Sequence, residues 1–90
     1  MPGMGNGPTV RGVPIRINKK SATPTYLQLA AELRRLIAEG ELAPGDQLPS
    51  LYVLVEETGL SHSTIQRAVG LLKAEGVLVS APGRGVFVAE

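Results

Sequence analysis

The 90-residue sequence contains no cysteine and only one histidine. Without cysteine, neither a disulfide nor a thiolate metal site can form, and a single histidine cannot build a metal cluster. No paired carboxylates and no nucleophile beside a base are apparent, so we expect no metal, no cofactor and no enzymatic activity. The sequence also lacks a signal peptide and an apolar run long enough to span a bilayer. We therefore expect a cytoplasmic protein.

The net charge is small, but the charges are unevenly distributed. The formal net charge is +1, yet residues 1–20 contain four basic residues and no acid, whereas residues 21–90 contain five basic and eight acidic residues. A slightly acidic folded part argues against strong nonspecific DNA binding, which depends on phosphate contacts. Specific binding remains compatible with it, because the charge at the contacting face matters more than the sum.

The N-terminal segment has the composition of a tail. Residues 1–14 are glycine-rich and basic and lack periodicity, which predicts a disordered tail ahead of one domain formed by residues 15–90. Arg16, Lys19 and Lys20 come next. Two interpretations fit these cations: an arm that contacts DNA phosphates or the minor groove, or incidental charge that keeps the chain soluble.

The stretch from Leu48 to Glu75 predicts two helices joined by a tight turn. Ser50 would cap the first helix, because a serine oxygen accepts a hydrogen bond from the free N–H groups at a helix start. Gly59 would end that helix in the left-handed conformation, which glycine adopts readily. Ser61 would cap the second helix. This arrangement is the helix-turn-helix pattern, whose second helix enters the major groove of DNA.

Helical periodicity supports the second of these helices, residues 61–75. At about 100° per residue, one side of it is apolar and comprises Ile65, Ala68, Val69 and Leu72. The opposite side comprises His62, Ser63, Gln66, Arg67, Gly70 and Lys73. No acid precedes Glu75. This polar face either reads DNA or is the solvated side of an ordinary core helix.

Two further elements are predicted ahead of this pair. Ile15–Ile17 alternates in polarity and would form a short edge strand. A longer amphipathic helix would follow, with Thr23 as its cap, Pro24 in its first turn and Gly40 at its end. Arg35 lies off the apolar face of that helix, where it either contacts a phosphate or, more simply, keeps the helix soluble.

A β-hairpin is predicted after the second helix. Beyond Gly76, two short valine-rich runs flank a glycine-rich tip. Helix-turn-helix followed by a hairpin predicts a winged helix, a mainly α fold with a small β-hairpin. The wing, residues 80–87, would lie beside the recognition helix. Arg84, between Gly83 and Gly85, would then approach the DNA backbone or the minor groove.

Several sequence blocks support a more specific identification. They are Pro24–Gln28, Ile37–Leu42, Pro44–Ser50, Leu60–Ile65, Leu72–Gly76 and Pro82–Gly85 with Phe87–Val88. With these blocks in this order, the chain resembles the N-terminal DNA-binding domain of the GntR family of bacterial transcription regulators, in its YtrA- and HutC-like branch. The resemblance covers Ile15 to Glu90.

The resemblance implies a repressor-type regulator that binds a palindromic operator. By position it assigns DNA contacts to Tyr52, Ser61, His62, Ser63, Thr64, Gln66, Arg67, Gly83 and Arg84. We predict that Ser50 and Gly85 also contact DNA. Three of the residues assigned by position depart from the family pattern, because Tyr52, His62 and Gln66 stand where arginine is usual. Fewer cations weaken the contact with phosphates, and the base preference also changes, since arginine favours guanine whereas glutamine favours adenine.

The family also implies a C-terminal ligand-sensing and dimerising domain. The chain ends where that domain would begin, so we expect either a fragment or a stand-alone domain, with no small-molecule effector. We expect a weak homodimer, or a monomer that pairs on DNA. Tyr52 and Val53 would point outward from the first helix of the pair. There Tyr52 donates a hydrogen bond to a phosphate, or both residues contact protein.

The interpretation that fits these patterns best is a sequence-specific, double-stranded DNA-binding transcription regulator that acts at the nucleoid. Two alternatives stay open. One is an excisionase-like architectural DNA-binding factor. The other is a winged helix that serves protein–protein interaction, which the acidic folded part and the missing arginines favour.

Overall fold

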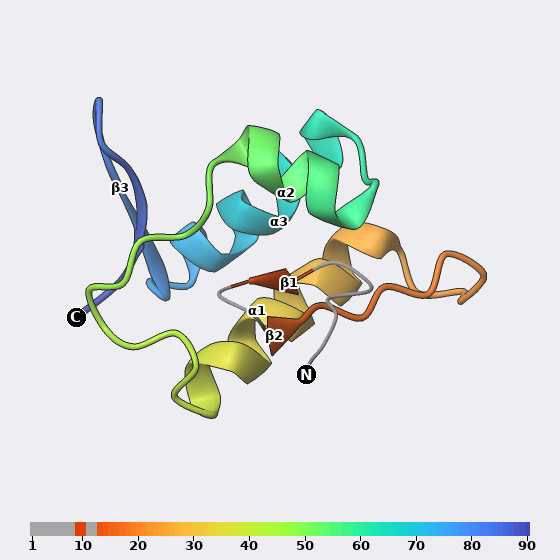
Figure 1. The fold of residues 1–90 in the computed structure, drawn as a ribbon, viewed down its shortest axis with the longest axis horizontal. Coiled ribbons are helices and arrows are strands. Elements are labelled where there is room, and N and C mark those ends of the chain that lie inside the picture. The colour runs from red at the N-terminus through yellow and green to blue at the C-terminus, as the bar shows by residue number, and fades with distance from the viewer. Residues whose placement is uncertain (1–8, 11–12) are drawn as a thin grey trace, which may run out of the picture.

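The computed structural model describes residues 9–10 and 13–90, and it is a winged helix as predicted (Figure 1). Its elements are β1 (Thr9–Val10), β2 (Val13–Pro14), α1 (Thr25–Ala38), α2 (Leu51–Thr58), α3 (His62–Ala74), β3 (Leu78–Ala81) and β4 (Gly85–Val88). The β3–β4 hairpin projects from the helices on the side of the C-terminus. No helix in the described part of the chain is long and apolar enough to cross a membrane.

The start of α1 differs from the prediction. Thr23 does not cap the helix; Pro24 occupies the N-cap position, and no side chain donates or accepts a cap hydrogen bond there. Proline suits this position because its missing N–H would have no partner within the helix. Gln28 stabilises the entry instead, since its amide Nε2 donates to the backbone oxygens of Asn18 and Thr23 at 2.9 and 2.7 Å. Gly40, with φ +82°, follows the end of the helix as predicted.

The helix-turn-helix forms from the local signals that predicted it. Ser50 Oγ accepts a hydrogen bond from the N–H of Val53 at the start of α2, and Ser61 Oγ accepts from the N–H of Thr64 at the start of α3. Gly59 ends α2 with φ +72°, in the left-handed region that favours glycine. The predicted caps and stop are therefore confirmed.

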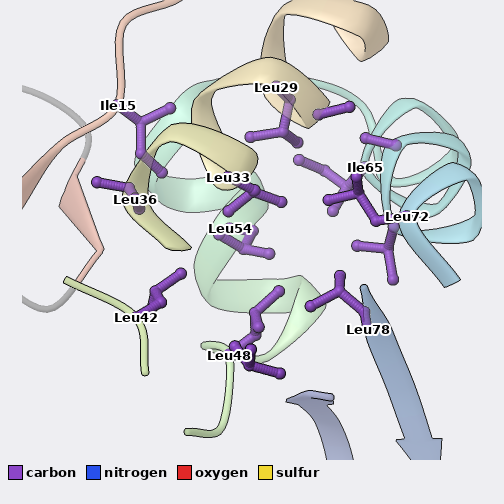
Figure 2. Packing of buried hydrophobic residues seen from close by; sticks show 14 of the residues in the cluster. Ile15, Leu29, Leu33, Leu36, Leu42, Leu48, Leu54, Ile65, Leu72 and Leu78 are labelled. Carbon is purple, nitrogen blue, oxygen red and sulfur yellow. The ribbon is translucent and has the colours of Figure 1, made fainter. Parts of the chain in front are cut away.

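Leucine and isoleucine side chains from all three helices and the hairpin meet in one core (Figure 2). Leu33 of α1, Leu54 of α2 and Leu72 of α3 are each no more than 1% exposed. Leu78 adds the base of the wing to the same cluster. Because the apolar face of α3 is held in this core, its polar face must point outward.

The wing consists of β3 and β4, which pair antiparallel with Val79 opposite Phe87. The hairpin is attached to the segment before α2. Gln47 forms an isolated antiparallel bridge with Phe87, and the N–H of Leu48 donates to Val86 O at 2.8 Å. These two contacts tie the wing to the start of α2.

The N-terminal region differs from the prediction in two ways. Thr9–Val10 pairs antiparallel with Val13–Pro14, inside the segment predicted to be a disordered tail; residues 1–8 and 11–12 lie outside the described part. The edge strand predicted at Ile15–Ile17 is wrong, because these residues belong to no strand among those that the structure describes. Their alternation has another cause: Ile15 is 2% exposed and belongs to the core, while Arg16 is exposed.

Candidate nucleic-acid interface

The first turn of α3 exposes a cluster of hydroxyl groups. Ser61 Oγ lies 2.8 Å from Thr64 Oγ1 and 3.3 Å from Ser63 Oγ, so the cap holds all three hydroxyls together. His62 is exposed beside them. The N-terminus of a helix carries a partial positive charge and free N–H groups, and both favour a phosphate. This end of α3 therefore suits an anionic partner.

Gln66 lies in the middle of the exposed face of α3. Its side chain is exposed, and no hydrogen bond joins it to any residue that the structure describes. A free carboxamide offers both a donor and an acceptor, which is the pair of groups needed to bind the major-groove edge of adenine. On one flank, Lys73 Nζ donates to Ser80 Oγ of the wing at 3.2 Å. The polar residues predicted for α3 thus share one accessible face, which continues onto β3 of the wing.

The tip of the wing presents Arg84 to solvent. Gly83 and Gly85 have φ values of +74° and +125°, so glycine is required on both sides of this arginine. Gln47 Nε2 donates to Arg84 O at 2.7 Å and fixes the turn from outside the hairpin. Arg84 Cζ lies 5.8 Å from the centre of the Phe87 ring. Sequence reasoning missed Gln47, because its partner is 37 residues away.

The exposed apolar pair of α2 lies where predicted. Tyr52 is 72% exposed and Val53 39% exposed. A groove of about 430 Å³ runs between the start of α2 and the wing, and its lining includes Ser50, Tyr52 and Arg84. Ser50 Oγ accepts the cap hydrogen bond and still has its own hydrogen to donate. The start of α2 and the tip of the wing therefore border the same groove.

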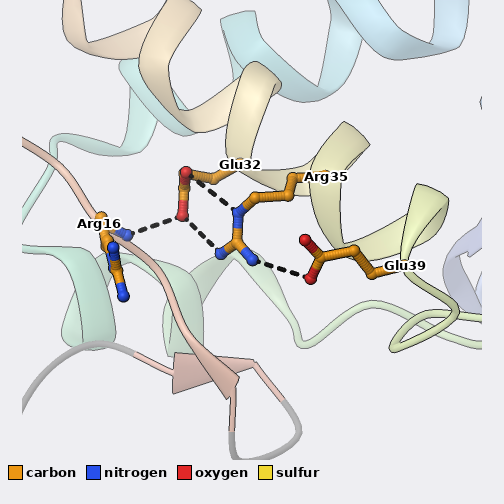
Figure 3. Close-up of polar contacts among 4 residues, drawn as sticks. All are labelled: Arg16, Glu32, Arg35 and Glu39. Atoms are coloured by element: carbon orange, nitrogen blue, oxygen red, sulfur yellow. Dashed lines mark hydrogen bonds and ion pairs between the residues drawn. The ribbon is translucent and has the colours of Figure 1, made fainter.

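The cations predicted as phosphate contacts have different surroundings. Arg35 lies between Glu32 of α1 and Glu39, the residue after that helix, with N–O distances of 2.9 and 3.0 Å (Figure 3). The hydrogen bonds that Arg35 donates to the Glu32 carboxylate raise the pKa of Arg35. Lys19 Nζ donates to Gly59 O at 3.3 Å, at the turn before α3, and Lys20 is exposed. Of these three side chains, Lys19 is the one held at the helix-turn-helix.

Glu32 connects the N-terminal segment to α1. Its Oε1 accepts from the backbone N–H of Arg16 at 3.0 Å and from Arg35 Nη2 at 2.9 Å. Burial raises the pKa of Glu32, but these two hydrogen bonds and the charges of both arginines outweigh it and lower the pKa below its ordinary value. This cluster is an ion-pair network on α1, and within residues 15–90 no group of three acidic or histidine side chains could hold a metal.

A contact between α1 and α3 was not anticipated from the sequence. Arg67 Cζ lies 4.2 Å from the centre of the Tyr26 ring, within the range of a cation–π interaction. The two residues are far apart in the chain, and neither belongs to a local motif that would pair them. Their proximity follows only from the packing of α1 against α3.

Residues 25–88 match the family model described as bacterial regulatory proteins, gntR family. The transcriptional repressor NagR of Bacillus subtilis is 40% identical over 76 residues, which are 84% of this chain and 31% of NagR. The repressor YtrA of the same organism is 33% identical over 84% of this chain and 58% of its own length. The chain thus spans less than two thirds of either relative.

Solved structures share the fold. YtrA from Sulfolobus acidocaldarius, a GntR-family transcription factor, superposes with a TM-score of 0.79 at 39% identity and covers 84% of this chain and 80% of that one. The AraR DNA-binding domain in complex with operator ORX1 gives a TM-score of 0.77 at 30% identity, over 83% and 96% of the two chains. The chain therefore belongs to the GntR family of bacterial regulatory proteins and carries its winged-helix DNA-binding domain.

Proposed function

We propose that residues 15–90 bind double-stranded DNA in a sequence-specific manner and regulate transcription, with α3 in the major groove. The observation that carries this proposal is the exposed face of α3, on which hydroxyl, amide and cationic groups follow one another with no acid before Glu75. Support comes from the AraR domain, which has this fold and was solved on an operator.

The residues divide into base readers and backbone contacts. Gln66 and Ser63 project from the first turns of α3, where side chains reach base edges. Ser61, His62, Thr64 and the start of α3 bind phosphate. Arg84 reaches the DNA backbone or the minor groove from the wing. Gly83 and Gly85, which have no side chains, let the wing approach the DNA closely. Tyr52 and Ser50 each donate a hydrogen bond to a phosphate from the start of α2.

A single domain of this kind reads one half-site. Two copies on a palindromic operator double the contacts, and dimeric helix-turn-helix proteins place their half-sites one helical turn apart. We propose a chain that is monomeric or weakly dimeric in solution and pairs on DNA, acting at the nucleoid. The named relatives are repressors, and repression is the corresponding output for this chain.

A second candidate function is protein binding by the same fold. The observation that favours it is the exposed pair of Tyr52 and Val53 beside an open groove. A partner seated there would cover the start of α2 and compete with DNA for the wing. This candidate predicts a winged helix with no preferred DNA sequence.

Binding-site selection from a pool of random duplex DNA distinguishes the two functions. The first predicts that successive rounds enrich one motif, with inverted repeats if two copies pair. Enrichment of no motif, with equal affinity for the starting and final pools, contradicts the first function and leaves the second.

A further inference from the structure

The arginines of α1 and α3 have two kinds of partner. Arg34 makes a bidentate contact with Glu75 at 3.1 and 2.6 Å, and Arg35 contacts Glu32 and Glu39. Arg67 differs from both, because it lies over an aromatic ring and not beside a carboxylate. The whole sequence has only three aromatic residues, so few rings are available to pack against an exposed arginine.

The ring orders Arg67 without occupying its hydrogen-bond donors. Tyr26 is half-buried near the start of α1, whereas Arg67 is exposed in the middle of α3. No hydrogen bond or ion pair joins Arg67 to any residue within the described part of the chain. A guanidinium packed on an aromatic ring loses rotational freedom, while its N–H groups, at the edge of its plane, stay available. Arg67 is thus pre-oriented and has free donors.

The position of Arg67 selects the DNA group that it can reach. Arg67 lies on the flank of α3 that faces α1, because its partner Tyr26 belongs to α1. Lys73 lies on the opposite flank and contacts Ser80 of the wing. A helix in the major groove has base edges in front of it and a phosphate strand on either side. A cation on the flank therefore faces phosphate.

We propose that Tyr26 is a positioning residue for DNA binding: its ring holds the guanidinium of Arg67 against the phosphate strand on the α1 side of the recognition helix. This inference rests on the proposed function. It adds a phosphate contact supported by α1 to those at the helix start and the wing. It also gives the chain an oriented cation on the flank of α3, which partly replaces the three arginines missing from its family pattern.

A double-mutant cycle tests the inference on the DNA site obtained by selection. The variants are Tyr26→Leu, Arg67→Ala and the two combined. We expect Tyr26→Leu to weaken binding about two- to fivefold, the range of an exposed cation–π contact. We expect Arg67→Ala to weaken binding on cognate and scrambled sites alike and to lower the salt slope by about one. In the Arg67→Ala background, Tyr26→Leu should have no further effect.

Conservative variants separate positioning from mere packing. Tyr26→Phe keeps the ring and should restore the affinity that Tyr26→Leu loses, whereas Arg67→Lys keeps the charge but not the flat group and should still weaken binding. Arg34→Ala is the matched control, because that arginine is paired with Glu75, and it should leave the salt slope unchanged.

Three outcomes would overturn the inference. One is that Tyr26→Leu reduces the DNA affinity by the same factor in the wild-type and in the Arg67→Ala background. Another is an unchanged salt slope in Arg67→Ala while the wild type still binds its site. The third is full affinity in Arg67→Lys, a result that decides the matter even if Tyr26→Leu does not fold. If the wild-type protein itself enriches no DNA motif, the proposed function is wrong, and the inference that rests on it is wrong as well.

Discussion

At the scale of single residues, the partner of each cation determines whether it is available to DNA. Arg34 is paired with Glu75, and Arg35 is paired with Glu32 and Glu39. Arg84 lies over Phe87 at the tip of the wing and has no carboxylate partner in the part of the chain that the structure describes. The small net charge of the chain therefore hides cations, such as Arg84, that no carboxylate in the described residues neutralises.

Arg84 should act on DNA without reading its sequence. We expect Arg84→Ala to weaken binding to cognate and scrambled sites by the same factor and to reduce the salt slope by about one, since one counterion fewer is released. Affinity titrations at several salt concentrations measure both quantities. A loss confined to the cognate site would instead make Arg84 a base reader.

At the scale of elements, the turn between α2 and α3 orients the recognition helix. Gly59 has φ +72°, and its backbone oxygen accepts a hydrogen bond from Lys19. A Cβ built at Gly59 would meet Lys19 Nζ at 3.1 Å, while one at Gly40, with φ +82°, would meet no atom within 4 Å. The two glycines share their backbone conformation but differ in what surrounds them.

Alanine at these two positions should therefore have comparable effects on stability and different effects on binding. Gly59→Ala and Gly40→Ala should each cost about 1–2 kcal/mol of unfolding free energy, because an L-residue is strained in the left-handed region. Only Gly59→Ala should also weaken DNA binding, since it changes how α3 leaves the turn. Chemical denaturation and DNA titration of both variants check this; equal DNA affinities would show that the turn does not orient α3.

The elements were predictable where the signal is local. Ser50, Gly59 and Ser61 act on backbone groups within a few residues, so the sequence pattern was enough to place α2 and α3. The contacts of Tyr26 with Arg67 and of Gln47 with the wing join distant segments and depend on helix packing. Ile15 shows the converse error, because an alternating pattern reflects burial of one side chain and not necessarily a strand.

At the scale of the whole molecule, the start of α2 and the wing border one groove. Tyr52 and Val53 lie exposed at that start. We expect Tyr52→Arg to strengthen DNA binding by adding a phosphate contact, and Val53→Glu to abolish paired binding on a palindromic site by introducing a charge between copies.

Stoichiometry and cooperativity on one and two half-sites measure these effects. Val53→Glu should leave binding to an isolated half-site intact, which serves as the control for folding. If both variants keep the affinity, stoichiometry and cooperativity of the wild type, this surface meets neither phosphate nor protein.

Gln66 provides the most direct test of whether α3 reads DNA bases. The measurement is the affinity of wild type and Gln66→Ala for the selected site, for each single-base variant of it and for a scrambled duplex. We expect Gln66→Ala to cost about 1–3 kcal/mol on the selected site and to abolish discrimination at one base position. An equal loss on the selected and scrambled sites, with every base preference retained, would contradict base reading by α3.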